Sequence, residues 1–242
     1  MAFDKDDFIY IPTANLWFAK KRFYEGKNWD ETWHHLIRDG LSMPTIEEFR
    51  VALRYLRDQK LSSYQNLYKE ITDRSFSWKS NWLDAYFEKR SDGIYLLTKN
   101  RTKEEKLEDC LTIGLSFGVS LDQWLDGNKK SVTSQGFLKS PSEPWTKGNL
   151  IFYEIEGNCA ARFFSDSNKV GINSGWGISS SDPCLGVFPI FYGSQGRFNP
   201  RTKVSPPSNY RNVSPPSTYR NPFEIDLPRI DKIENVVYGG KE

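Results

Sequence analysis

Residues 160–188 read AARFFSDSNKVGINSGWGISSSDPCLGVF, a long polar segment between two apolar, strand-like ends. Between Phe163 and Leu185 lie 21 residues, of which 13 are Ser, Gly, Asn or Asp. Small polar residues give adaptable hydrogen bonding, and a rigid aromatic such as Trp176 supplies contact area at low entropic cost, as in antibody loops. The composition therefore predicts a displayed binding loop, although an ordinary Gly/Ser-rich loop has the same composition.

The two ends of this stretch also carry a family resemblance. Ala161-Arg162-Phe163, the 21-residue gap and Leu185-Gly186-Val187-Phe188 resemble the C-terminal variable region of diversity-generating retroelement variable proteins, in particular the archaeal type. Residues 23–32 (FYEGKNWDET), 40–49 (GLSMPTIEEF) and 82–85 (WLDA) are similar to the N-terminal part of the same proteins. The resemblance spans residues 20–192.

The resemblance implies a C-type lectin-like fold that presents a hypervariable ligand-binding face, diversified by a reverse transcriptase that copies adenines with errors. The variable region would cover about residues 160–190, with Arg162, Phe163, Leu185, Gly186 and Val187 as its fixed frame. The candidate variable or ligand-contacting residues lie between these ends: Phe164, Asp166, Asn168, Gly171, Asn173, Gly175, Trp176, Ser179, Ser180, Ser181 and Asp182. For Trp176, burial under its own loop is the alternative to an exposed binding role.

We therefore expect an α+β fold of the C-type lectin-like type, in its formylglycine-generating-enzyme variant, with two N-terminal helices beside irregular antiparallel sheets and many loops. This domain would cover residues 1–199. Residues 200–242 would form an extended arm rich in Pro, Ser and Asn, because VSPPSNYRN (204–212) and VSPPSTYRN (213–221) are tandem copies. Such a segment buries too little apolar surface to fold alone, so it is either an arm on the body or a mobile tail.

Local signals predict the secondary structure upstream of the variable region. Apolar spacing and caps predict helices over 28–39, from Thr45 to about Gln59, and over 62–72; Thr45 and Glu48 form a capping box. Residues 82–87 and 94–97 predict a hairpin. Residues 103–107 fit a helical turn or a solvated crossing, and 115–148 are expected to be loops. Strands are expected at 149–155, 159–164 and 185–192.

Composition argues against several classes of function. The net charge is +2, with 33 basic and 31 acidic residues interspersed, so we expect no nucleic-acid partner. The two histidines, His34 and His35, are adjacent on a predicted helix and cannot converge on one metal. The acidic N-terminus predicts no signal peptide, and no apolar run predicts a membrane-spanning helix. We expect no membrane insertion, a cytoplasmic or virion-associated location, and a monomer that binds a protein or cell-surface ligand.

Two activities of proteins with the C-type lectin-like fold are alternatives to ligand binding without catalysis or metal. A formylglycine-generating-enzyme-like oxidoreductase would use a cysteine pair, and Cys159 and Cys184 flank the polar segment, but only Arg162 lies near them to activate a thiol. A disulfide between them stays open. Calcium-dependent sugar binding would need more oxygen ligands than Asp166 and Asp182. We therefore expect no enzyme activity, no cofactor and no required metal; an undiversified structural or virion protein is the other alternative.

Overall fold

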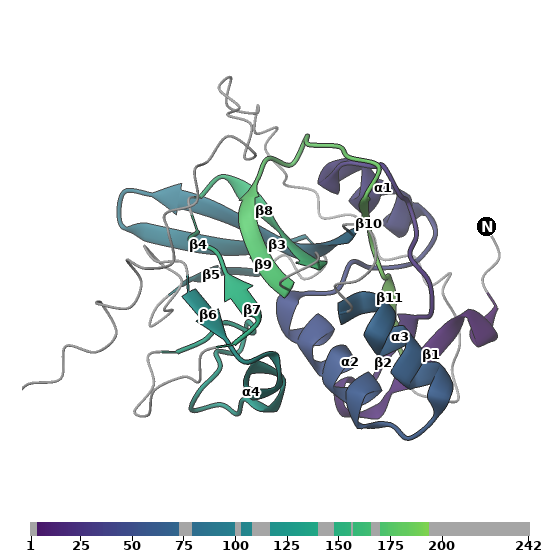
Figure 1. Ribbon diagram of the computed structural model, residues 1–242. Coiled ribbons are helices and arrows are strands. Elements are labelled where there is room, and N and C mark those ends of the chain that lie inside the picture. The colour runs from purple at the N-terminus through teal and green to yellow at the C-terminus, as the bar shows by residue number, and fades with distance from the viewer. Residues whose placement is uncertain are drawn as a thin grey trace, which may run out of the picture. The chain divides into compact units, whose positions relative to one another are not determined.

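The computed structural model describes residues 4–72, 79–99, 103–107, 117–139, 148–155, 157–165 and 170–193. Within these ranges the protein is an α+β fold with a three-stranded and an eight-stranded sheet (Figure 1). The predicted arm at 200–242, with its tandem repeat, lies outside the described residues. No helix of the described ranges is long and apolar enough to span a membrane.

Three helices follow the first hairpin, at the positions that caps and periodicity predict, so a third helix joins the two expected from the family resemblance. Helix α1 covers Trp29–Arg38 and α2 covers Ile46–Asp58. Both begin with a complete capping box, Asn28 with Glu31 and Thr45 with Glu48, which pairs backbone N–H groups that would otherwise be unsatisfied. Helix α3 covers Ser62–Thr72, as predicted.

The three-stranded sheet joins the two ends of the described chain. Strand β1 (Phe8–Ile11) follows a 3-10 turn, η1 (Lys5–Asp7), and a second turn, η2 (Pro12–Ala14), leads into β2 (Leu16–Ala19). Strand β11 (Ile190–Tyr192) pairs antiparallel with β2, so that Phe191 lies opposite Trp17. Residues 8–19 were not predicted as strands; β1 and β2 pair with each other as a hairpin, and the third strand of their sheet lies more than 170 residues away.

The larger sheet is built on the long strand β3 (Lys79–Arg90) and has the order β5-β4-β3-β8-β9-β7-β6, with β10 pairing beside β3. The predicted hairpin is confirmed as β3 and β4 (Gly93–Thr98). The other strands are β5 (Lys103–Lys106), β6 (Phe117–Val119), β7 (Leu150–Phe152), β8 (Cys159–Ser165), β9 (Val170–Trp176) and β10 (Leu185–Gly186). Two pairings are parallel, β7 with β9 and β10 with β3, so the sheet is mixed.

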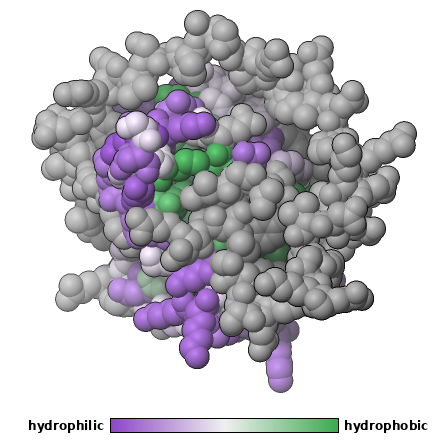
Figure 2. Space-filling view, turned by 90° about the vertical axis from the view of Figure 1, so that its left-hand side faces the viewer, coloured by the Kyte–Doolittle hydropathy of each residue, from purple (hydrophilic) through white to green (hydrophobic). Residues whose placement is uncertain are grey.

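One expectation for the middle of the chain is wrong. Residues 103–106 are neither a helical turn nor a crossing, because β5 forms the edge of the sheet beside β4. An edge strand tolerates the charged sequence Lys-Glu-Glu-Lys, which has no apolar period to reveal it. Near the tip of the β3–β4 hairpin, Arg90 pairs with Glu88 and with Glu104 of β5. Figure 2 shows hydrophilic side chains gathered on the side of the molecule to which this hairpin points in Figure 1. The expected loops at 115–148 contain β6 and a short helix, α4 (Leu121–Asp126).

Two apolar clusters form the core. The larger one lies between the eight-stranded sheet and helices α2, α3 and α4, and includes Phe49, Phe163 and Trp124. The smaller one gathers α1, one face of the three-stranded sheet and β10, and includes Trp29 and Trp176. Alternate residues of β1 and β2 enter different clusters, so the small sheet is buried on both faces. Five of the described tryptophans are buried in these clusters: Trp17, Trp29, Trp33, Trp82 and Trp124.

Candidate functional site

The stretch predicted as a displayed loop is mainly a β-hairpin. Strand β8 continues through Phe164 to Ser165, and β9 returns from Val170 to Trp176, pairing antiparallel with β8. Among the described residues of this stretch, Gly177–Cys184 lies outside regular structure before β10 begins, and we call it the surface segment. Asp166 and Asn168 lie outside the described residues. The expectation of one long loop is therefore wrong, because Val170 and Ile172 supply an apolar alternation that the polar composition conceals.

A bulge in β9 decides where Trp176 lies. Arg162 pairs with Asn173 and Ala160 with Trp176, so one residue of β8 faces two residues of β9, Ser174 and Gly175. A bulge re-aims the side chains that follow it. It places Trp176 on the same face as Arg162, where the ring is 3% exposed. The alternative that Trp176 is buried therefore holds, and its expected role as an exposed contact is wrong.

Phe164 and Gly171 are also unsuited to direct ligand contact. Phe164 is 4% exposed and its ring packs against Tyr153, with 5.8 Å between centroids. Gly171 lies opposite Phe164 in the hairpin, and a Cβ at this position would lie 2.5 Å from the Phe164 ring and 3.0 Å from the Ile151 carbonyl oxygen. Any side chain at Gly171 must displace a buried ring. Both residues are packed within the hairpin, so we leave them out of the binding surface proposed below.

Six candidate residues do reach the surface. Gly175, Ser179 and Ser181 are exposed, and Asn173, Ser180 and Asp182 are half-buried. Local hydrogen bonds order them: Asn173 Oδ1 accepts from the Gly175 N–H at 2.7 Å, and Asp182 Oδ1 accepts from the Cys184 N–H at 2.8 Å. The Ser180 N–H donates to the Gly177 carbonyl, which closes a turn. The polar surface thus lies at the end of β9 and along the surface segment.

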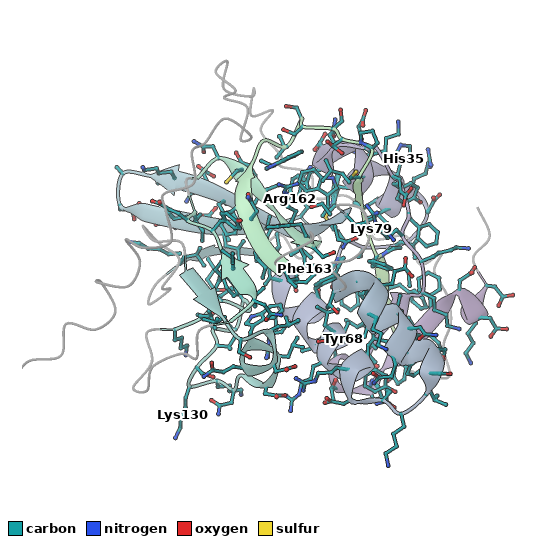
Figure 3. All side chains as sticks on the ribbon, in the orientation of Figure 1. His35, Tyr68, Lys79, Lys130, Arg162 and Phe163 are labelled. Atoms are coloured by element: carbon teal, nitrogen blue, oxygen red, sulfur yellow. The ribbon has the colours of Figure 1, made fainter. Side chains whose placement is uncertain are left out.

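At the N-terminal side of the frame, Phe163 and Arg162 are buried on opposite faces of β8. Phe163 is fully buried and packs against Phe49 of α2, with ring centroids 5.0 Å apart. Arg162 points to the other face, where its guanidinium carbon lies 3.8 Å from the centroid of Trp176 and Nη1 donates to Ser80 Oγ at 3.4 Å. Figure 3 shows Phe163 toward α2 and Arg162 on the side of α1. A cation over an indole in a desolvated site is a favourable contact.

The C-terminal side of the frame is held from two directions. Leu185 and Gly186 pair parallel with β3, and Val187 forms a two-way bridge with Phe23. Gly186 is covered by the side chain of Arg22, and a Cβ on this glycine would lie 2.7 Å from Arg22 Nη2. The same nitrogen donates to the carbonyl oxygens of Ser80 (3.0 Å) and Cys184. Burial lowers the pKa of Arg22, and Glu25 opposes that shift.

The segments that carry the resemblance meet around this frame. The Trp29 indole N–H donates to the Leu83 carbonyl at 2.8 Å, and the Trp82 indole N–H donates to the Lys27 carbonyl at 3.0 Å. Trp82 itself lies opposite Arg162 in the β3–β8 pair. Residues 23–32, 82–85 and the two ends of the variable region therefore form one packed unit, although they are far apart in the sequence.

The two cysteines that the structure describes, Cys159 and Cys184, are not joined to each other. The disulfide left open by the sequence is therefore not formed. Burial raises the pKa of the Cys184 thiol, and the nearby Asp182 carboxylate raises it further. The described residues contain no group of three or more His, Cys, Asp or Glu side chains that could hold a metal ion. His35 stacks on Tyr24, and His34 lies 3.5 Å from Asp30.

Sequence reasoning missed Arg22 and the bulge at Ser174–Gly175. Arg22 follows two lysines, and a run of three basic residues predicts a solvated surface. A sequence signal for the bulge exists, since an isolated glycine inside a strand pattern indicates one. Both features fix the ends of the polar surface rather than contribute to it.

Comparisons with known proteins return no relatives. No protein-family model, no curated protein and no solved structure matches the chain.

Proposed function

We propose that this protein is a ligand-binding display protein of C-type lectin-like architecture, whose variable surface is diversified by a retroelement and binds protein or cell-surface ligands. The surface would consist of Asn173, Gly175 and the polar residues of the surface segment, Ser179, Ser180, Ser181 and Asp182. Binding is its function in this proposal, and catalysis is not.

The proposal depends on the separation of buried frame residues from surface residues within residues 162–187. The five frame residues are buried, and six candidate residues between them lie on the surface. Gly177 also has room for a side chain, because a Cβ there would lie 3.6 Å from Ser180 Oγ, an ordinary contact. A Cβ at Gly175 would lie 3.3 Å from Asn173 Oδ1, so this half-buried side chain would have to shift by a few tenths of an ångström. A surface whose side chains contact little of the core can change without unfolding the protein.

The arrangement of the remaining segments supports the lectin-like architecture. The resemblance joins residues 23–32, 40–49 and 82–85 to the variable region, and these segments pack together in the folded chain. The raised pKa of Cys184 speaks against the oxidoreductase alternative, because a reactive thiol requires a lowered pKa.

Two displayed libraries test the binding proposal. The first randomises Asn173, Gly175 and residues 179–182; the matched control library randomises the buried neighbours Gly171, Ile172, Ser174 and Trp176. We expect most clones of the first library to resist protease and to yield binders to an arbitrary protein target, and most control clones to be digested. Equal digestion of both libraries would contradict the proposal.

A genomic search tests the diversification. We expect a near-copy of the DNA that encodes residues 160–190, differing mainly at adenines, beside a reverse transcriptase gene. In natural populations the substitutions should fall on the outward positions and avoid Gly171 and Trp176. Variation spread evenly over buried and exposed positions would argue against this origin.

A further inference from the structure

Tyr86 lies close to the proposed binding surface, although it belongs to the central strand β3. It pairs with Ala160 of β8, and Ala160 pairs with Trp176 of β9, so the three residues form one row across the sheet. Directly paired residues of antiparallel strands point to the same face. This is the face on which Figure 3 shows Arg162, since Ala160 and Arg162 are alternate residues of β8. At the usual spacing of strands, the backbones of Tyr86 and Trp176 are roughly 10 Å apart, with the small side chain of Ala160 between them.

The side chain of Tyr86 is fixed at its ring and open at its hydroxyl. The residue is half-buried, and its ring packs at the margin of the smaller cluster, with its centroid 6.0 Å from that of Trp29. Within the part of the chain that the structure describes, the Tyr86 hydroxyl has no hydrogen-bond partner and is not a buried atom. By contrast, the hydroxyls of Tyr24 and Tyr95 donate to Asp39 and Asp92. Tyr86 therefore presents an oriented, accessible polar tip.

A half-buried leucine extends the same row on the other side of Tyr86. Leu97 of β4 is paired with Tyr86, so the two side chains lie next to each other on one face of the sheet. At the opposite end of the row, the residue after Trp176 is Gly177, where the surface segment begins. The row therefore leads from an accessible apolar part, at Leu97 and Tyr86, to the polar surface.

Tyrosine is well suited to binding proteins whose surfaces differ. Its ring supplies a large contact area with few rotatable bonds, and its hydroxyl bonds to whichever polar group faces it. Burial raises the pKa of Tyr86, so the hydroxyl stays protonated at neutral pH and can both donate and accept. An aromatic residue bordered by polar positions is also the usual arrangement of an interface hot spot.

We propose that Tyr86 and Leu97 form the constant apolar part of the ligand-binding surface, next to its variable part at Asn173, Gly175 and residues 179–182. The partner is a protein ligand that places an apolar side chain on the Tyr86 ring and a polar group at its hydroxyl. Tyr86 and Leu97 lie outside residues 160–190, so they stay the same while the variable part changes. This inference rests on the proposed binding function and names the fixed residues that serve each ligand.

Binders to one purified protein, lysozyme, test the proposal. Clones of the full chain are selected from the library randomised at Asn173, Gly175 and residues 179–182. Tyr86→Ala and Tyr86→Phe are then introduced into several independent clones, and Tyr55→Ala, which removes a half-buried tyrosine from α2, is the matched control. Surface plasmon resonance measures the Kd for lysozyme, and circular dichroism checks that each variant is folded. In the parent clones, mass spectrometry compares the oxidation of Tyr86 by hydroxyl radicals with and without lysozyme.

We expect Tyr86→Ala to weaken lysozyme binding at least about tenfold in most clones, Tyr86→Phe to weaken it less, and Tyr55→Ala to leave it unchanged; a tenfold change corresponds to about 1.4 kcal/mol. Bound lysozyme should also slow the oxidation of Tyr86 several-fold.

Binders that keep their affinity in Tyr86→Ala, or whose Tyr86 is oxidised equally fast with and without lysozyme, would overturn this proposal and leave the proposed function standing. A library that yields no binder would overturn the proposed function, and this proposal with it. If Tyr86→Ala fails to fold, the oxidation of Tyr86 in the parent clones still decides.

Discussion

Strand β9 and the surface segment have nearly the same composition and opposite environments. Four of the seven residues of Val170–Trp176 and five of the eight residues of Gly177–Cys184 are Gly, Ser, Asn or Asp. The strand is hydrogen-bonded between β8 and β7 and is mostly buried, whereas the segment is mostly exposed or half-buried. The difference arises from Val170, Ile172 and Trp176, which anchor the strand in both clusters. Polar content alone therefore does not identify a display surface.

Among variants of β9 and the surface segment, removal of the Trp176 ring should destabilise the fold most. We expect Trp176→Ala to lower the free energy of unfolding by about 3–5 kcal/mol, because it opens a cavity in the smaller cluster and removes the contact with Arg162. Urea unfolding measures the change. Trp176→Phe, which keeps an apolar ring, should cost less than half as much. A cost below about 1 kcal/mol for Trp176→Ala would mean that the ring is exposed as a binding residue.

The two glycines of β9 provide a matched pair. Gly171→Ala should cost about 1–3 kcal/mol, since the added methyl group meets the Phe164 ring and the Ile151 carbonyl oxygen. Gly175→Ala should cost less than about 1 kcal/mol, because the methyl group meets only Asn173 Oδ1 at 3.3 Å, and this half-buried side chain needs to shift by only a few tenths of an ångström. Thermal and urea unfolding of both variants give the comparison. Equal costs would remove the distinction between inward and outward positions.

The reactivity of the Cys184 thiol tests the environment at the C-terminal end of the surface segment. Its raised pKa leaves less thiolate at a given pH than a free cysteine has, so alkylation by iodoacetamide at pH 8 should be several-fold slower in the folded chain than in urea. Mass spectrometry of the Cys184 peptide measures the rate. Asp182→Asn keeps the acceptor for the Cys184 N–H and removes the charge, so it should speed the reaction. A folded-state rate above that of the unfolded chain would restore the reactive-thiol alternative.

The smallest effect is expected within the surface segment. The triple variant Ser179→Ala, Ser180→Ala, Ser181→Ala should change the free energy of unfolding by no more than about 0.5 kcal/mol, because these hydroxyls lie at the surface. The same urea titration used for Trp176→Ala serves as the measurement. A loss above about 2 kcal/mol would show that the segment is part of the frame, and the proposed display surface would then have no freely variable stretch.

The sequence predicts the local elements of this fold better than the long-range ones. Helices α1, α2 and α3 follow from their caps and apolar spacing, and the β3–β4 hairpin follows from its turn. Strand β5 was missed because its sequence, Lys-Glu-Glu-Lys, has no apolar period, and β1 and β2 were missed although they form a local hairpin. In the candidate site, the frame residues were expected from the family resemblance, and three of them, Phe163, Leu185 and Val187, are also apolar. The burial of Trp176 could not, since it depends on the register between β8 and β9.

The placement of β11 has a consequence for how the protein is made. The hairpin of β1 and β2 is synthesised first, yet its third strand is Ile190–Tyr192, and β10 joins β3 only a few residues earlier. At translation rates of about 5–20 residues per second, the first hairpin waits on the order of ten seconds or more for that partner. Neither sheet can be completed on a partial chain, so we expect final folding to follow synthesis of residue 192, and nascent chains cut short before it to be recognised by chaperones.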